Sequence, residues 1–245
     1  MPTSRPAPGA RARNVLFITA DQFRGDCLSA LGHPLVRTPN LDALAADGTL
    51  FTRHYAQCAP CGPSRASLYT GLYMHTHRSV RNGTPLDGRH TNIALETRKA
   101  GYRPALFGYT DTSLDPRFHP EDVISRVGYQ GVLPGFDDVV HLTDSLDPWI
   151  AHLKDRGYTI PENSRDIYNP VNGYPGAEGR GRAYAPPIYS DADSEAAFLT
   201  DAIVDYVKAT PDPWFVHVSY LPPHPPFCRR PLRQPAACPR PLPVG

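Results

Sequence analysis

The chain has 245 residues, a formal net charge of +1 and 40% hydrophobic residues, which is sufficient for one globular domain. Its near-neutral charge gives no electrostatic basis for binding nucleic acid, and no apolar run is long enough to cross a membrane. The five cysteines lack the spacing of a disulfide framework, and the first residues lack the apolar core of a signal peptide, so we expect reduced thiols and a cytoplasmic location.

The first predicted strand follows a short N-terminal segment. Residues 1–13 are rich in Pro, Arg and Ala, and we expect a flexible arm. Residues 14–21 (NVLFITAD) are an apolar run ending in Asp21, as in a buried parallel strand. Because ligands of open α/β sheets collect at the carboxyl ends of strands, Asp21 is placed to bind a metal. Residues 38–48 (TPNLDALAADG) then predict a helix that ends at a glycine.

The most informative segment is residues 61–71 (CGPSRASLYTG). Cys61 is followed by Pro63 and Arg65, and Cys-x-Pro-x-Arg is the pattern at which cysteine is converted to formylglycine. Residues 64–72 predict a short helix with proline in its first turn. Cys61 would then lie at a helix N-terminus, where free backbone amides favour an anionic ester. The alternative is a structural cysteine in front of an ordinary helix.

The later elements also predict an α/β fold. Residues 102–109 (YRPALFGY) and 214–220 (WFVHVSY) read as strands, and residues 190–208 predict an amphipathic helix. Residues 110–190 are rich in Pro, Gly and Asp, with Trp149 and Tyr158 among short helical stretches. We expect an insertion over the active-site face that either covers the pocket or packs against another subunit. The loop after the last strand carries His224 between prolines; imidazole at such a rigid position can protonate a leaving alkoxide near neutral pH.

The pattern of strands and helices stops near the end of the chain. Residues 228–245 are rich in Pro and Arg, with no acidic residue and no apolar period, so neither helix nor sheet is expected. We therefore predict a disordered tail at residues 228–245 and one partial domain at residues 14–227.

The formylglycine pattern, the helix at residues 38–48 and the His-Pro-Pro-Phe segment at residues 224–227 closely resemble type I sulfatases and phosphonate monoester hydrolases of the alkaline phosphatase superfamily. The sequence of residues 71–87 is similar to that of the phosphonate monoester hydrolase and broad arylsulfatase subgroup. The resemblance implies an α/β fold, with a mostly parallel sheet sandwiched by helices. It covers only the N-terminal half, so we expect a truncated domain.

The resemblance also implies roles for individual residues. Formylglycine made from Cys61 would be the nucleophile, and one divalent metal (Ca, Mn or Zn) would be bound by Asp21 and by the oxygen derived from Cys61. The remaining carried-over roles are anion binding by Arg65 and Asn82, a pocket position for Tyr109, and leaving-group assistance by His224.

One position departs from the resembling subgroup. Asp111 stands where that subgroup has a hydroxyl residue, so its carboxylate either points away from the anion site or alters the choice of substrate. His75 and His77 form a His-x-His pair, which is a weak metal signal, and we assign neither to the site.

The resemblance implies hydrolysis of small sulfate, phosphonate or phosphate esters, with a formylglycine-generating enzyme as a further partner. Family members oligomerise, but we do not extend this to a partial domain. They continue for about as long again, through further metal ligands, and Asp21 with Cys61 alone predicts weak metal binding. The alternative is therefore a non-catalytic remnant with at most a binding or interaction role. A zinc phosphatase or phosphomutase is disfavoured because Cys61 replaces its Ser or Thr nucleophile.

Overall fold

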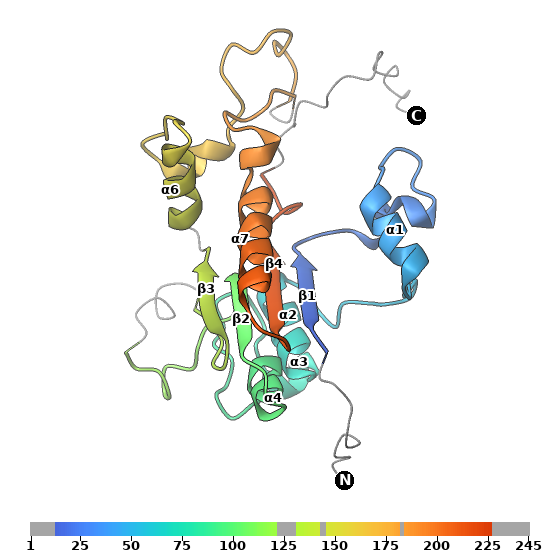
Figure 1. Ribbon diagram of the computed structural model, residues 1–245, viewed down its shortest axis with the longest axis vertical. Helices are drawn as coiled ribbons and strands as arrows, with labels where there is room; N and C mark the ends of the chain where they lie inside the picture. The colour runs from blue at the N-terminus through green and yellow to red at the C-terminus, as the bar shows by residue number, and fades with distance from the viewer. Residues whose placement is uncertain (1–12, 122–130, 143–145, 182–183, 227–245) are drawn as a thin grey trace.

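The computed structural model of the protein is built on one parallel β-sheet. It describes residues 13–121, 131–142, 146–181 and 184–226, so most of the predicted arm and the whole predicted tail lie outside the described residues. The sheet has the strand order β1-β4-β2-β3, with all paired strands parallel (Figure 1). The strands are β1 (Val15–Ala20), β2 (Pro104–Gly108), β3 (Asp137–His141) and β4 (Phe215–Tyr220).

The two central strands are buried on both faces. Every residue of β2, and every residue of β4 except Tyr220, is buried, as expected for parallel strands covered by helices on both sides. Successive side chains of a strand point to opposite faces, so Phe107 and Val218 enter one core while Leu106 and Phe215 enter the other. The sheet therefore separates two hydrophobic cores.

The first core lies between the sheet and helices α6 (Asp147–Asp155) and α7 (Glu195–Ala209), and Figure 1 shows α7 running across this face. Trp149 of α6 is fully buried, and its indole Nε1 donates a hydrogen bond of 2.9 Å to the carbonyl of Asp193. The apolar side of α7 packs against the same core through Phe198, Leu199, Ala202, Ile203, Tyr206 and Val207.

The second core lies on the opposite face, under helices α2 (Cys61–Thr70) and α4 (Ile93–Lys99), and the short helix α3 (Met74–His77) packs against α2. The side chain of Asn92 caps α4 by accepting hydrogen bonds from two of its first amides. Helix α2 is terminated by Gly71, which adopts a left-handed conformation, φ 69°, and whose amide donates a hydrogen bond to the carbonyl of Ser67. The buried apolar residues of this core are Ala66, Tyr69, Leu86, Ala94, Leu106, Leu114, Leu133, Phe136 and Phe215.

Helix α1 (Pro39–Asp47) lies beyond β1, apart from both cores (Figure 1), and none of its residues is buried. Among the described residues, no helix combines the length and apolar character that a membrane crossing requires. Four short 3-10 helices complete the described structure: Gly25–Cys27, Ser29–Leu31, Ser164–Tyr168 and Asp191–Asp193.

The predicted α/β fold, with its parallel sheet between helices, is confirmed. The three predicted strands correspond to β1, β2 and β4, and the three predicted helices to α1, α2 and α7. Helix α2 begins at Cys61 rather than at Ser64, so the predicted nucleophile belongs to the first turn of the helix. The interpretation of residues 110–190 as an insertion is wrong in part, because this segment supplies the sheet strand β3 and the core helix α6.

His217 makes the stability of the fold depend on pH. It is fully buried in β4, and burial lowers the pKa of its imidazole from 6.5 to about 4. Nδ1 lies 3.0 Å from the carbonyl of Phe17, which can only accept a hydrogen bond, and Nε2 lies 2.9 Å from the hydroxyl of Tyr69. The neutral ring satisfies both partners, with Nδ1 donating and Nε2 accepting.

Between pH 6.5 and 4 the unfolded chain therefore binds a proton at this residue that the folded chain does not bind. We expect the free energy of unfolding to fall as pH decreases through this window, by about 3 kcal/mol in total. Urea unfolding at a series of pH values checks this, with His217→Gln as the non-titrating control. Equal pH slopes in the two proteins would contradict the prediction.

Candidate functional site

The candidate site lies at the carboxyl edge of the sheet, where ligands of open α/β sheets bind. Asp21 follows β1, Tyr109 follows β2, and the loop with His224 follows β4. The register places these ends together, and the amide of Asp21 extends the ladder to the carbonyl of Tyr220 at 3.0 Å. A cavity of about 310 Å³ opens here, lined by Asp21, Cys61, Asn82, Tyr109, Asp111, Leu142, Leu146, Arg165, Tyr168, Glu195, Leu221, His224, Pro225 and Pro226.

Cys61 is held at the first turn of α2 by Asn82. The amide group of Asn82 accepts a hydrogen bond of 2.9 Å from the backbone N–H of Gly62 and places its Nδ2 3.0 Å from the Cys61 sulfur. A Cβ atom on Gly62 would lie 3.0 Å from Asn82 Oδ1 and 3.4 Å from the carbonyl of Asp111. A larger residue there would crowd Asn82, so glycine favours this close approach of Asn82 to the predicted nucleophile.

Arg65, one turn further along α2, is buried beneath the cavity, with 6% of its surface exposed. Its Nη1 donates to the hydroxyl of Ser219 at 2.7 Å, and its Nη2 lies 3.1 Å from the hydroxyl of Tyr109 and 3.4 Å from Asp21 Oδ2. The guanidinium also stacks 4.4 Å from the centre of the Tyr109 ring. Arg65 thus joins α2 to the ends of three strands.

Tyr109 and Asp21 form the second part of this network. The Tyr109 hydroxyl donates to Asp21 Oδ2 at 2.8 Å, and burial raises the pKa of that hydroxyl, which therefore stays protonated at neutral pH. Burial opposes the charge of Arg65, but the surrounding hydroxyls and carboxylates outweigh it and raise the pKa of Arg65. Arg65 therefore stays charged, the Tyr109 hydroxyl stays protonated, and both donate hydrogen bonds to Oδ2 of Asp21.

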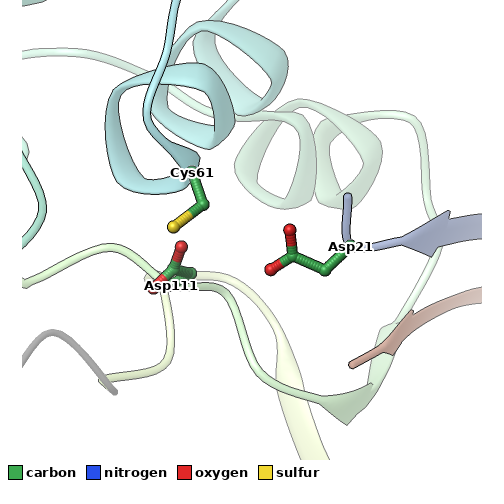
Figure 2. Close-up of side chains that lie close together, drawn as sticks. All are labelled: Asp21, Cys61 and Asp111. Carbon is green, nitrogen blue, oxygen red and sulfur yellow. The ribbon is translucent and has the colours of Figure 1, made fainter. Parts of the chain in front are cut away.

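Asp111 is the site residue whose placement the sequence did not decide. Its side chain points toward the sulfur of Cys61 and does not turn away (Figure 2). Donor atoms of Asp21, Cys61 and Asp111 all lie within 4.8 Å of one another. Asp111 is 3% exposed, and its Oδ2 lies 3.8 Å from Arg65 Nε. Within the described residues that oxygen has no hydrogen-bond partner.

The conformation of Asp111 follows from the end of β2. Gly108 has φ 106°, and a Cβ there would lie 2.4 Å from the carbonyl oxygen of Ser219, so only glycine fits this close contact with β4. Asp111 itself has φ 52°, a left-handed conformation that aspartate tolerates better than most residues. The position of Asp111 shortly after a predicted strand indicated that it lies near the site, but the sequence did not predict its left-handed backbone conformation.

Burial and neighbouring charge disfavour negative charge at the centre of the site. Burial, followed by repulsion from Asp111, raises the pKa of the Cys61 thiol. Burial likewise raises the pKa of the Asp111 carboxyl to about 6, although the Cys61 thiol and the Arg65 guanidinium oppose the shift. Unmodified Cys61 is therefore mainly a neutral thiol and a poor nucleophile near neutral pH.

The donor set fits a divalent metal. Two carboxylates and a third donor at position 61 converge, and a buried oxygen of Asp111 lacks a hydrogen-bond partner among the described residues. Carboxylates and an oxygen at position 61 suit Ca²⁺ or Mn²⁺, and a thiolate there suits Zn²⁺. Asp21 and Cys61, the two ligands predicted from the sequence, belong to this group.

The predicted acid, His224, lines the same cavity. Its Nδ1 lies 2.6 Å from the carbonyl of Pro225, and because a carbonyl only accepts, Nδ1 donates and Nε2 is the nitrogen available for proton exchange. Leu142 and Leu146 line the cavity as well. Part of the segment predicted to cover the active-site face therefore does contribute to the pocket.

The other histidines on this side of the sheet have structural contacts. His75 is exposed and stacks on Tyr73, whereas His77 is buried 2.8 Å from the hydroxyl of Ser67. His77 Nδ1 accepts from the amide of Ser79, so in the neutral ring Nε2 carries the proton and donates to Ser67. His77 therefore cannot act as the base for Ser67, and neither histidine belongs to the cavity-lining residues.

The parallel sheet between two helical layers, with its polar pocket at the carboxyl edge, defines an alkaline-phosphatase-like α/β protein. The sequence model described as Sulfatase matches residues 13–239, and the chain belongs to the sulfatase family of the alkaline phosphatase superfamily. The "Multifunctional alkaline phosphatase superfamily protein PehA" of Trinickia caryophylli is 37% identical over 223 residues, which are 88% of this chain and 42% of that protein.

Two solved structures are also similar. The phosphonate monoester hydrolase of Agrobacterium radiobacter superposes with a TM-score of 0.82 at 49% identity, over 90% of this chain and 43% of that protein. The phosphonate monoester hydrolase SpPMH from Silicibacter pomeroyi gives a TM-score of 0.81 at 45% identity, with the same coverage. The chain thus spans less than half the length of these relatives.

Removing the Arg65 guanidinium should destabilise the protein strongly. Two buried carboxylates, Asp21 and Asp111, would lose their cation, and breaking a buried pair in this way costs about 3–5 kcal/mol. We expect Arg65→Ala to lower the free energy of unfolding by this amount and Arg65→Lys by less, because lysine keeps the charge but not the fork of donors. Urea unfolding measures both.

The matched control is Arg156→Ala. Arg156 faces Asp193 at 3.7 Å, but its side chain is 60% exposed, so its loss should change stability by less than about 1 kcal/mol. A loss for Arg65→Ala no larger than that of the control would show that the buried cation does not organise the site.

Proposed function

We propose that the protein hydrolyses sulfate or phosphonate and phosphate esters, with formylglycine derived from Cys61 as its nucleophile. The observation that carries the proposal is the fixed position of Cys61: it starts helix α2, contacts Asn82 Nδ2 at 3.0 Å, and faces a cavity shared with Asp21 and His224. The relatives named as phosphonate monoester hydrolases support the phosphonate side of the proposal. An arylsulfatase of Clostridium perfringens, 38% identical over 96 residues, supports the sulfate side.

Each residue of the pocket has a role in this proposal. The first amides of α2 and the side chain of Asn82 orient the anionic group of the ester. Tyr109 fixes the carboxylate of Asp21 through its hydrogen bond of 2.8 Å. Arg65 does not line the large cavity, so it positions Asp21 and Tyr109 from below. His224, with Nδ1 held by a backbone carbonyl, donates a proton from Nε2 of its imidazolium form to the departing alkoxide and returns to the neutral ring.

The proposed reaction also requires an aldehyde at position 61 and a divalent metal. A hydrated aldehyde formed from Cys61 would supply two hydroxyls on one carbon, one as the nucleophile and one whose deprotonation would release the inorganic anion. Asp21 and residue 61 would hold a divalent metal, which would supply positive charge for the anionic ester. The donor set at the pocket fits such an ion.

The proposal also names partners and a location. The substrate is a small sulfate or phosphonate ester, and a formylglycine-generating enzyme acts on Cys61. The three described cysteines, Cys27, Cys58 and Cys61, are unpaired thiols, which supports a reducing, cytoplasmic environment.

The test is coexpression of the chain with a formylglycine-generating enzyme. Peptide mass spectrometry should find an aldehyde at residue 61, because the Cys-x-Pro-x-Arg pattern is complete. The modified protein is then assayed with an aryl sulfate and a phenyl phosphonate ester. We expect turnover to fall about a hundred- to a thousand-fold in Asn82→Ala, which loses a preorganised donor, and by a similar factor in His224→Ala.

Cys61→Ala is the control, since it folds around the same pocket without a nucleophile. An unmodified thiol at Cys61 after coexpression would contradict the formylglycine proposal. An aldehyde without turnover above the Cys61→Ala control would favour the alternative, a non-catalytic binding or interaction role for this polypeptide.

A further inference from the structure

We propose that Asp111 is a third metal ligand, and that Asp21, Cys61 and Asp111 together bind one divalent cation before Cys61 is modified. The three side chains come from different parts of the fold: the end of β1, the first turn of α2 and the loop after β2. Their donor atoms lie within 4.8 Å of one another, so small side-chain rotations would bring them to a common ion.

The unsatisfied oxygen of Asp111 is the independent sign of a ligand. A buried carboxylate oxygen normally has a hydrogen-bond partner, because its burial without one is costly. Asp111 is 3% exposed, and its Oδ2 has no such partner in the part of the chain that the structure describes. Figure 2 shows the carboxylate directed at Cys61 and facing the same space as Asp21. A cation in this space would satisfy it.

The charges at the metal-bound site would favour a divalent cation over a monovalent one. If coordination releases the thiol proton of Cys61, the two carboxylates and the resulting thiolate would carry three negative charges, and Arg65, 3.4 Å from Asp21 and 3.8 Å from Asp111, would return one positive charge. Two negative charges remain in a largely buried volume. A divalent ion neutralises them, and a monovalent ion does not.

The contacts of Asp21 leave room for the ion. The hydrogen bonds from Tyr109 and Arg65 both reach Oδ2 of Asp21, so Oδ1 is available for coordination. Two carboxylates, one thiolate and an open fourth position match the three-ligand tetrahedral arrangement of accessible zinc sites. Zn²⁺ is therefore the expected ion for the thiol form, since thiolate favours it over Mg²⁺, Ca²⁺ or Mn²⁺.

This inference rests on the proposed function only in placing the metal at the same pocket, and its test requires neither the aldehyde nor turnover. The protein is produced without a formylglycine-generating enzyme, with Cys228→Ser and Cys238→Ser to remove the thiols outside the described residues. It is titrated with Co²⁺ as a spectroscopic substitute for Zn²⁺, and the near-ultraviolet thiolate-to-cobalt absorption is recorded. We expect one Co²⁺ per chain, displaced by Zn²⁺.

The variants assign the ligands. Cys61→Ser should abolish the thiolate absorption, and Asp111→Asn should weaken Co²⁺ binding by more than the 10- to 100-fold that loss of an outer-shell partner typically costs. Asparagine tolerates the left-handed backbone at this position. Asp115→Asn is the matched control, since Asp115 is also buried but is paired with Arg117, and Cys58→Ser is the control for the thiol. Both should leave Co²⁺ binding unchanged.

Unchanged Co²⁺ affinity in Asp111→Asn, or no thiolate absorption in the parent protein with excess Co²⁺, would overturn the proposal. Should Asp111→Asn fail to fold by circular dichroism, anomalous diffraction from zinc-loaded crystals of the parent protein decides the question. Zinc about 2.0–2.2 Å from an Asp111 oxygen is the expected result, and zinc elsewhere is the contrary one. Loss of ester hydrolysis with an intact cobalt site would contradict the proposed function alone.

Discussion

The arrangement of the site depends on one buried cation. Arg65 reaches from helix α2 to the ends of β1, β2 and β4 through Asp21, Tyr109 and Ser219. A buried carboxylate is tolerated only when a positive charge or several donors accompany it. Arg65 therefore allows two carboxylates to approach each other and Cys61, and the same contacts fix α2 against the sheet, so that the carboxylates and the start of α2 are brought to one cavity.

Much of this fold could be predicted because its central strands are continuous apolar runs and α7 has a helical apolar stripe. Strand β3 (Asp137–His141) could not be predicted, because an edge strand is paired on one side only and its sequence, DDVVH, carries charge. Helix α6 could be predicted only as a short helical stretch around Trp149, and its place in the core could not, because its nine residues stand in a segment rich in prolines and glycines. Its buried Trp149 becomes a core residue through contacts with segments distant in sequence, such as those of Tyr168 and Tyr189.

Some residues of the candidate site could likewise be predicted from the sequence, and others could not. Asp21 and Cys61 could be predicted because they stand at a strand end and a helix start, where topology brings residues together, and His224 because its segment after β4 resembles one of the family. The burial of Arg65 beneath the pocket and the inward turn of Asp111 could not be predicted. They depend on contacts between separate segments. One example is Gly108, which approaches the Ser219 carbonyl so closely that a Cβ on residue 108 would lie 2.4 Å from that oxygen. No local pattern encodes such a contact.

The inward turn of Asp111 has a consequence for the proposed chemistry. Without a metal, the carboxylates of Asp21 and Asp111 outnumber the guanidinium of Arg65, so an anionic ester entering the cavity meets net negative charge despite the amides of helix α2. The proposed divalent cation between the carboxylates would reverse that sign. Because coupling between two ligands is reciprocal, the anion must in turn strengthen cation binding. In the proposed hydrolase, metal and ester binding are therefore one linked equilibrium, and Asp111 makes this chain more dependent on the metal than a hydroxyl residue at the same position would.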